Sequence, residues 1–224
     1  MPRTARASVG GICYHVINRG NARGEVFHKP EDYASFCRLL QEAGERVRMR
    51  VLAYCLMPNH FHLALWPRQD GDLSRFMQWL LTAHVRRYHH HYRSGGHVWQ
   101  GRFKAFPIQQ DDHLVTVLRY IERNPLRAGL VGRAEDWLWS SLRGRGGKVG
   151  DAVLPMHESP VPLPGQWARW VNESMADAEV ARLRQSVNRG TPFGPEGWTR
   201  RIANRLGLEA SLRPRGRPPK QAEK

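Results

Sequence analysis

The 224-residue chain has few cysteines, few acidic residues and no long apolar run. Its cysteines, Cys13, Cys37 and Cys55, are an odd number without CxxC spacing, which argues against a disulfide framework and a four-cysteine zinc site. No apolar run approaches the roughly 18 residues that cross a bilayer, and the first residues, MPRTARASVGG, contain no signal-peptide apolar stretch. We therefore expect a cytoplasmic protein with no membrane partner.

The shortage of acidic residues leaves a large positive charge. The chain has 35 Lys and Arg against 20 Asp and Glu, a formal net charge of +15, and a pI near 10.8. With 41% hydrophobic and 25% charged residues it is expected to fold around a core and to have a well-solvated surface. An arginine-dominated excess of this size favours phosphate groups, so a polyanionic partner is predicted.

Strand and helix patterns alternate through the first 142 residues. Strands are expected at 11–18, 50–57, 61–66 and 103–108. Helices are expected to begin at Pro30, to run from 72 to about 92, and to run from Asp111 to about Asn124, where Pro125 should end the last one. The order predicts an α+β, ferredoxin-like split βαβ sandwich with an antiparallel sheet and a further helix packed on it.

The composition changes after this first region, which we take as one domain, 1–142. Gly-, Arg- and Pro-rich residues predict a linker at 143–166. A C-terminal helical extension is expected at 167–212, with helices at about 167–187 and 198–206. The last residues, 213–224, form a basic tail that is too polar to fold alone.

Two histidines stand at alternate positions of one predicted strand. Because strand residues alternate between faces, His60 and His62 project to one side and Phe61 to the other. Imidazole is a common neutral metal ligand, and such a pair can hold one divalent ion with positions left open for substrate oxygens. Taken alone, the pair is explained better as two partly buried histidines that form hydrogen bonds with carbonyl groups than as a metal site.

The third predicted helix carries a tyrosine beside its apolar stripe. At about 100° per residue, Tyr120 and Asn124 lie together roughly 80 to 120° from the stripe. One helical turn separates the phenol from the carboxamide, so both side chains can address one small site. Taken alone, Tyr120 is more simply a tyrosine at the boundary of the core.

Three segments occur together in order: YHVINRG, MPNHFHLALWP and LRYIERNPLRAGLV. Their order and spacing resemble the single-tyrosine HUH transposases, in which HUH denotes a His-hydrophobic-His element. More narrowly, the chain resembles the REP-associated tyrosine transposases, domesticated relatives of insertion-sequence transposases that act on repetitive extragenic palindromes. The likeness continues through RQSVNRGTPFG, RLGLE and RPRGRPPK, and so covers about Gly11 to Lys220.

The resemblance implies a HUH endonuclease fold and a particular chemistry. His60 and His62 would bind Mg²⁺ or Mn²⁺, Tyr120 would be the nucleophile, and Asn124 falls where these families place a third, amide ligand. The implied activity is metal-dependent cutting and rejoining of single-stranded DNA through a 5′-phosphotyrosine. The implied partner is DNA with palindromic, REP-like hairpins, bound by a monomer or a homodimer in the nucleoid.

The chemistry requires positive charge near the phenol. A phenol has a pKa near 10 when unperturbed, so a cation must favour the phenolate at neutral pH. We expect the metal and the flanking Arg119 and Arg123 to supply it. The same ion would polarise the scissile phosphate and stabilise the departing 3′ oxygen.

Other residues are candidates for DNA contact. Arg102 and Lys104 lie among aromatic residues, a mixture that suits unpaired bases and phosphates, although a strand edge explains it equally well. Asn18 and Arg19 stand at the end of the first strand. They are candidates for DNA contact, and the alternative is that they shape a turn with Gly20. The tail that contains Arg213, Arg215 and Arg217 resembles an AT-hook, a motif that binds the minor groove of DNA. The alternative is a basic tail that only increases solubility.

Two alternatives stay open at this point. The first is a catalytically silent protein of the same fold that only binds DNA hairpins, and intact His60, His62 and Tyr120 argue against it. The second is a metallohydrolase with water as nucleophile, which predicts cleavage without a covalent protein–DNA adduct.

Overall fold

The computed structural model describes residues 8–146 and 156–213. A four-stranded antiparallel sheet stands at its centre, with strand order β2-β3-β1-β4. The strands are β1 (Cys13–Arg19), β2 (Arg50–Met57), β3 (His60–Trp66) and β4 (Lys104–Ile108). With helices between β1 and β2 and between β3 and β4, this arrangement confirms the predicted ferredoxin-like α+β fold.

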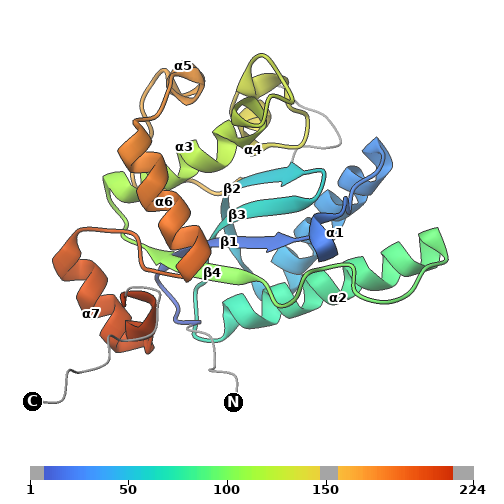
Figure 1. Ribbon diagram of the computed structural model, residues 1–224, viewed down its shortest axis with the longest axis horizontal. Coiled ribbons are helices and arrows are strands. Elements are labelled where there is room, and N and C mark those ends of the chain that lie inside the picture. Colours follow the sequence, from blue (N-terminus) through green and yellow to red (C-terminus); the bar gives the residue numbers. More distant parts are fainter. Residues whose placement is uncertain (1–7, 147–155, 214–224) are drawn as a thin grey trace, which may run out of the picture.

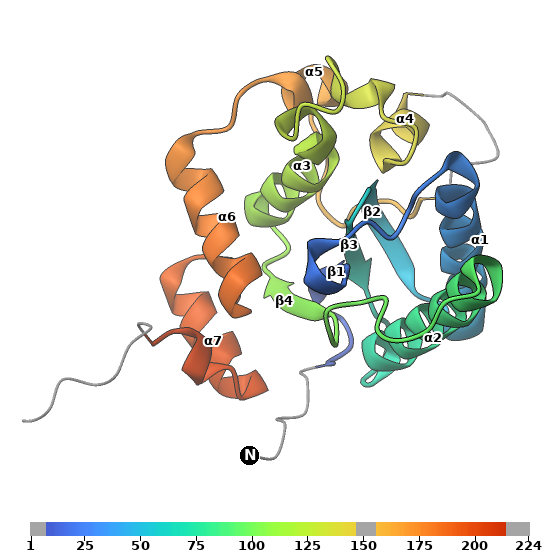
Figure 2. The same cartoon turned by 45° about the vertical axis from the view of Figure 1, so that its right-hand side comes forward.

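One face of the sheet is covered by two long helices, α1 (Pro30–Val47) and α2 (Asp72–Tyr92), which lie together on one side of the strands in Figures 1 and 2. Alternate strand residues point into this layer and form the larger core cluster; among them are Tyr14, Val16 and Phe61. Phe61, the residue between the two histidines, is fully buried here.

The opposite face of the sheet is covered by α3 (Asp112–Arg127), which is labelled above the sheet in Figure 1. Asp111 caps the start of α3 by accepting a hydrogen bond from the His113 amide, as its acidic character predicted. The apolar stripe of α3, with Leu118 and Ile121, packs against strand residues such as Ala64 in a second core cluster.

The prediction that α3 ends at Asn124 is wrong, because the helix continues through Pro125 to Arg127. A proline lacks the amide that would bond the carbonyl four residues before it. Here the Asn124 side-chain amide lies 3.3 Å from the carbonyl oxygen of Ile121 and 2.9 Å from that of Tyr120, and donates to both. The carboxamide thus replaces the missing donor, and the helix survives the proline.

The C-terminal region contains four further helices among the described residues: α4 (Ser141–Arg145), α5 (Trp167–Asn172), α6 (Asp177–Arg189) and α7 (Glu196–Leu206). The helical module predicted for 167–187 consists of two helices, α5 and α6. Arg119 and Arg123 of α3 donate to carbonyl groups at the end of α5, which would otherwise accept the next helical amides. None of the helices in the described ranges has the length and apolarity to cross a membrane.

A buried carboxylate joins this region to α3. Glu122 has no exposed surface, and it accepts hydrogen bonds from Ser141 Oγ at 2.5 Å, Arg145 Nε at 2.8 Å and Trp167 Nε1 at 2.5 Å. One side chain of α3 thereby holds both α4 and α5. A buried charge is tolerated only when it is paired and hydrogen-bonded in this way.

Glu122→Ala is expected to lower the free energy of unfolding by about 3–5 kcal/mol, because the half-buried Arg145 loses its partner inside the protein. Urea unfolding followed by tryptophan fluorescence measures the change. The matched control is Glu42→Ala on the exposed side of α1, which should shift the value by less than about 0.5 kcal/mol. Equal effects of the two substitutions would show that Glu122 has no such structural role.

Candidate active site

The pairing of β1 with β3 sets the positions of the two predicted histidines. His60 lies opposite Arg19 and His62 lies opposite Ile17, so all four side chains share the face covered by α3. The ring centroids of His60 and His62 are 5.0 Å apart. Strand alternation therefore predicted the common face of the imidazole pair correctly.

Tyr120 projects from α3 directly onto this pair. Its ring centroid is 5.9 Å from that of His62, and the two rings meet edge to face. The side chain is only 4% exposed, whereas the helical pattern placed it at the edge of the core. Among the residues that the structure describes, the Tyr120 hydroxyl makes no hydrogen bond.

A third histidine completes the cluster and was missed from the sequence. His15 of β1 is fully buried, and its Nε2 lies 2.8 Å from Nδ1 of His62, with the two rings stacked at 5.0 Å. Its ring centroid also lies 6.2 Å from that of Tyr120. The only sequence signal was its alternate position on a strand, which says nothing about which strand lies next to it.

The imidazoles are held in the form that binds metals. His60 Nδ1 lies 2.7 Å from Asn59 Oδ1 and therefore donates to it, so its Nε2 keeps a free lone pair. Burial lowers the pKa of His60 to about 4, with smaller contributions from Arg19 and Arg127. Burial also lowers the pKa of His62 well below its ordinary value. Both rings are neutral near pH 7.

This donor set fits one divalent cation. Two neutral imidazoles on one strand, each with its Nδ1 engaged by a neighbour, can turn their Nε2 atoms toward a shared ion. Within residues 8–146 and 156–213, no group of three or more His, Cys, Asp and Glu side chains is arranged to hold a metal. Two protein ligands leave coordination positions for substrate oxygens.

Asn124 was expected to be a third metal ligand, but in the structure its carboxamide forms hydrogen bonds within α3. It is fully buried, its amide donates to carbonyl groups of α3, and its Oδ1 accepts a hydrogen bond from Arg127 at 2.6 Å. Both polar ends of the carboxamide are therefore engaged within the helix. In this arrangement Asn124 stabilises the end of α3 and positions Arg127.

The positive charge beside Tyr120 comes from Arg127, which the sequence reading missed. Its guanidinium carbon lies 5.4 Å from the centroid of the Tyr120 ring. Arg119 and Arg123, which were expected to supply this charge and to contact DNA, donate instead to the carbonyl groups of Trp170 and Val171. Both side chains therefore serve to hold α5, and their contact with DNA stays a prediction.

The remaining DNA-contact candidates fall into two groups. Arg19, Arg102 and Lys104 line a common recess beside the histidines, together with Asn18. Asn18 itself is buried, and its amide donates to the Gly101 carbonyl, so it shapes this turn. Of the tail candidates, Arg213 is exposed, while Arg215 and Arg217 lie outside the described residues.

Comparison with known proteins shows which family the chain belongs to. The family model described as Transposase IS200 like matches residues 8–124, from the segment before β1 to Asn124 in α3. A Haemophilus influenzae protein assigned to the REP-associated tyrosine transposases is 30% identical over 123 residues, which cover 50% of this chain and 69% of that protein. The Escherichia coli REP-associated tyrosine transposase is 23% identical over 137 residues, 59% of this chain and 77% of the relative.

Among solved structures, a REP-associated tyrosine transposase bound to a REP hairpin superimposes with a TM-score of 0.53 at 21% identity, covering 69% of this chain and 94% of that one. This likeness shows a shared fold. The fold and the sequence matches together define the class as the IS200-like transposases, which are enzymes that act on DNA. Within that class, the chain belongs to the REP-associated tyrosine transposases.

The histidine cluster should make the protein sensitive to acid. Burial lowers the pKa of His15 to about 3 and that of His60 to about 4, whereas histidine in an unfolded chain has a pKa of about 6.5. The unfolded state then binds more protons below pH 6.5, so the free energy of unfolding falls as the pH drops from about 6.5 toward 4.

Urea unfolding in the presence of a chelator should show a loss of about 2 kcal/mol for each such histidine between pH 6.5 and pH 5. The loss should be smaller in His15→Phe, in which one of these groups no longer titrates. A stability that is constant over this range, or NMR spectra that show charged His15 and His60 at pH 5.5, would contradict the assignment of neutral rings.

Proposed function

We propose that this transposase cuts and rejoins single-stranded DNA with Tyr120 as nucleophile and a divalent ion held by His60 and His62. The observation that carries the proposal is the position of the Tyr120 ring, 5.9 Å from His62 and on the same face of the sheet as His60. Among the described residues, no other tyrosine ring contacts either of these two histidines. The arrangement supplies a nucleophile and two ligands at one point.

The ion we propose is Mg²⁺ or Mn²⁺, because both prefer oxygen ligands and the phosphate oxygens of the substrate would fill the positions that the two histidines leave open. Once bound, it supplies polarisation of the scissile phosphate and stabilises negative charge on the departing oxygen. His60 and His62 hold the ion, Asn59 orients the first ring, and His15 orients the second. The Nε2 of His60 keeps its lone pair because its Nδ1 donates to Asn59, and the Nε2 of His62 keeps its lone pair when its Nδ1 donates to His15 Nε2.

The Tyr120 oxygen attacks the phosphorus, and the bond from phosphorus to the 3′ oxygen breaks. The phenol proton is lost, the strand ends in a free 3′-OH, and the other end is a 5′-phosphotyrosine. Arg127, whose guanidinium carbon lies 5.4 Å from the centroid of the ring, places a positive charge beside the nucleophile. Since one phosphodiester replaces another of similar energy, the 3′-OH of a second strand can reverse the step without ATP.

Tyr120 is 4% exposed, so the strand reaches it only when the edge-to-face contact with His62 opens. The phosphate then takes the place of that contact, with the phenol on one side and the imidazole pair on the other. Catalytic contacts are commonly looser or differently aligned before substrate binds, and a small movement of one side chain on α3 suffices. The substrate thus opens the site that it uses.

The substrate we propose is single-stranded DNA with palindromic, REP-like hairpins. Support comes from the net charge of +15 and from the related solved transposase that is bound to a REP hairpin. Residues 1–142 would form the nuclease domain, and 167–212 would be a DNA-binding extension. The alternatives, a silent hairpin-binding protein and a hydrolase that uses water, are separated from this proposal by one assay.

Tyr120→Phe is expected to abolish the covalent protein–DNA adduct, because the nucleophilic oxygen is absent while the ring is kept. The assay incubates the protein with Mn²⁺ and an end-labelled strand that contains a palindromic hairpin, and resolves the products on a denaturing gel. Tyr88→Phe on α2 is the matched control and should form the adduct normally. Cleavage that persists without adduct in Tyr120→Phe would instead establish water as the nucleophile.

His60→Ala and His62→Ala should lose nicking by at least about 100-fold and retain hairpin binding, because each removes one of two ligands. Hairpin binding is measured by fluorescence anisotropy in a chelator. Unimpaired nicking by either variant would refute the metal assignment, and hairpin binding without nicking in the wild-type protein would favour the silent alternative.

His15→Phe is expected to weaken Mn²⁺ binding by about 10- to 100-fold, the usual effect of losing the group that orients a ligand histidine. The aromatic ring keeps the stacking on His62 but removes the 2.8 Å hydrogen bond. Titration of Mn²⁺ without DNA, followed by electron paramagnetic resonance, measures the affinity directly. His84→Phe, at a buried histidine of α2, is the control. An unchanged affinity in folded His15→Phe would exclude the positioning role.

A further inference from the structure

A recess opens beside the histidine pair on the face of the sheet that α3 covers. Ile17 of β1 is in register with His62 of β3 on one side and with Lys104 of β4 on the other, so the three side chains form one row. Over Ile17 lies a cavity of about 200 Å³ that is also lined by Arg19 and by Asn188 near the end of α6. The recess therefore begins next to the candidate active site and leads away toward α6.

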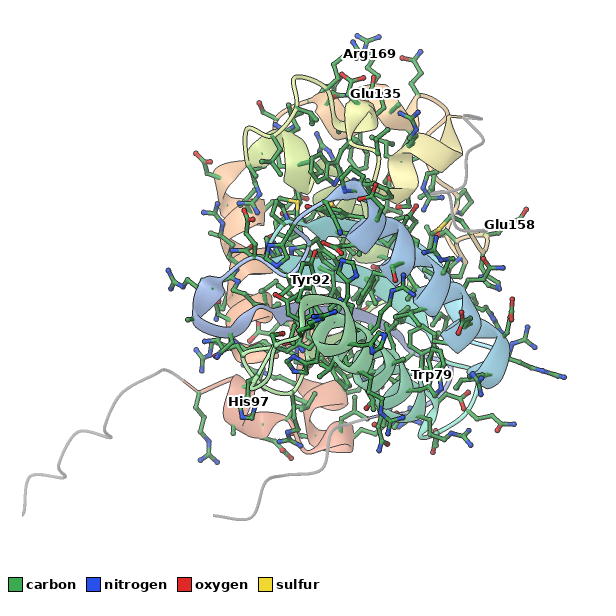
Figure 3. The ribbon with its side chains drawn as sticks, turned by 90° about the vertical axis from the view of Figure 1, so that its right-hand side faces the viewer. Trp79, Tyr92, His97, Glu135, Glu158 and Arg169 are labelled. Atoms are coloured by element: carbon green, nitrogen blue, oxygen red, sulfur yellow. The ribbon has the colours of Figure 1, made fainter. Side chains whose placement is uncertain are left out.

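A second and larger cavity, about 800 Å³, continues from the first around the edge of β4. The two share five lining residues: Gln100, Gly101, Arg102, Lys104 and Asn188. The far wall of the larger cavity is formed by Arg189 and, after α7, by Gly207, Leu208, Ala210 and Ser211. His97, labelled in Figure 3, also lines this cavity. We call the two cavities together the β4 groove.

The groove is positively charged. Arg19, Arg102, Lys104 and Arg189 line it, and no Asp or Glu does. In the described part of the chain none of these four cations forms an ion pair, although seven such pairs occur elsewhere. Four unpaired cations around one concave surface favour an anionic ligand, and phosphate groups match them best.

The wall made by the C-terminal extension is bonded in place. The Phe193 amide donates to the Pro107 carbonyl at 2.8 Å, and the Gln109 amide donates to the Phe193 carbonyl at 3.0 Å, which extends the sheet beyond β4 by a short bridge. Thr191 Oγ1 donates to the Ser211 carbonyl at 2.9 Å. The groove is therefore formed by the fold itself, between the edge of β4 and the α6–α7 segment.

We propose that the β4 groove binds the unpaired DNA strand that adjoins the phosphate attacked by Tyr120, with the C-terminal extension as one wall of the binding site. This inference rests on the proposed function. The groove starts at Arg19, which lies opposite His60 in the sheet, so a strand that leaves the histidine pair enters it directly. Four cations along its length match successive phosphates of that strand.

The shape favours a single strand over a duplex. A double helix presents its phosphates on a stiff convex surface, and proteins read it with protruding helices or ribbons. A cavity of about 800 Å³ instead takes one or more nucleotides whose bases turn out of a stack. Binding of a paired stem in the groove is therefore an outcome that would contradict the proposal.

The test compares a hairpin that carries an unpaired flank with the same hairpin without it. Binding is measured by fluorescence anisotropy in a chelator on a Tyr120→Phe background, so the result is independent of cleavage. The double substitution Arg102→Ala/Lys104→Ala should weaken binding of the flanked hairpin about tenfold and leave the blunt hairpin unchanged. For the flanked hairpin, the slope of log K against the logarithm of the salt concentration should become shallower by about 1.4. This is about 0.7 for each of the two cations removed from a single-strand contact.

The matched control is Arg38→Ala/Arg86→Ala, which removes the same charge from exposed positions of α1 and α2 on the other side of the sheet. It should change the affinity for both DNAs equally and by less than the groove variant. Equal weakening of flanked and blunt hairpins by the groove variant, or no weakening at all, would overturn the proposal. Failure of the adduct assay with intact preference for the flanked hairpin would count only against the tyrosine mechanism.

Discussion

The site depends first on the polar anchoring of α3, the helix that carries Tyr120. The buried Glu122 carboxylate binds α4 and α5, while Arg119 and Arg123 bind the carbonyl groups that end α5. These bonds hold α3 in place while the Tyr120 ring contacts His62. A nucleophile displaced by about 1 Å can lose a hundredfold in rate, so such anchoring has direct chemical value.

Burial sets the electrostatics of the same site. Desolvation keeps His15, His60 and His62 neutral, and the positive charge of Arg127 acts in the same direction on His60 and His62. The same guanidinium lies 5.4 Å from the centroid of the Tyr120 ring. Asn124 holds it there through a hydrogen bond of 2.6 Å, so one side chain sets the charge around both the tyrosine and the histidine pair.

The features that the sequence predicted well are local. Strand alternation placed His60 and His62 on one face, because the period of two depends only on neighbouring residues. β2 spans the predicted 50–57, because the Pro58-Asn59 turn that ends it directly follows it in the sequence. The missed features depend on packing between distant segments. His15 meets His62 through strand pairing, 47 positions apart, and Arg119 bonds a carbonyl 51 positions away. The end of α3 was missed because a neighbouring side chain replaced the donor that Pro125 lacks.

The C-terminal extension is attached both to α3 and to β4, and each attachment lies beside a different part of the proposed reaction. Its first helix, α5, is bonded to α3 near Tyr120, and Thr116 of α3 donates to Glu179 of α6. The segment after α6 is bonded to β4 beside the groove. Residues 173–176 join α5 directly to α6, so the segment that anchors α3 is continuous with the segment that forms one wall of the groove. A DNA strand bound in the groove would therefore contact the same part of the chain that supports the helix of Tyr120.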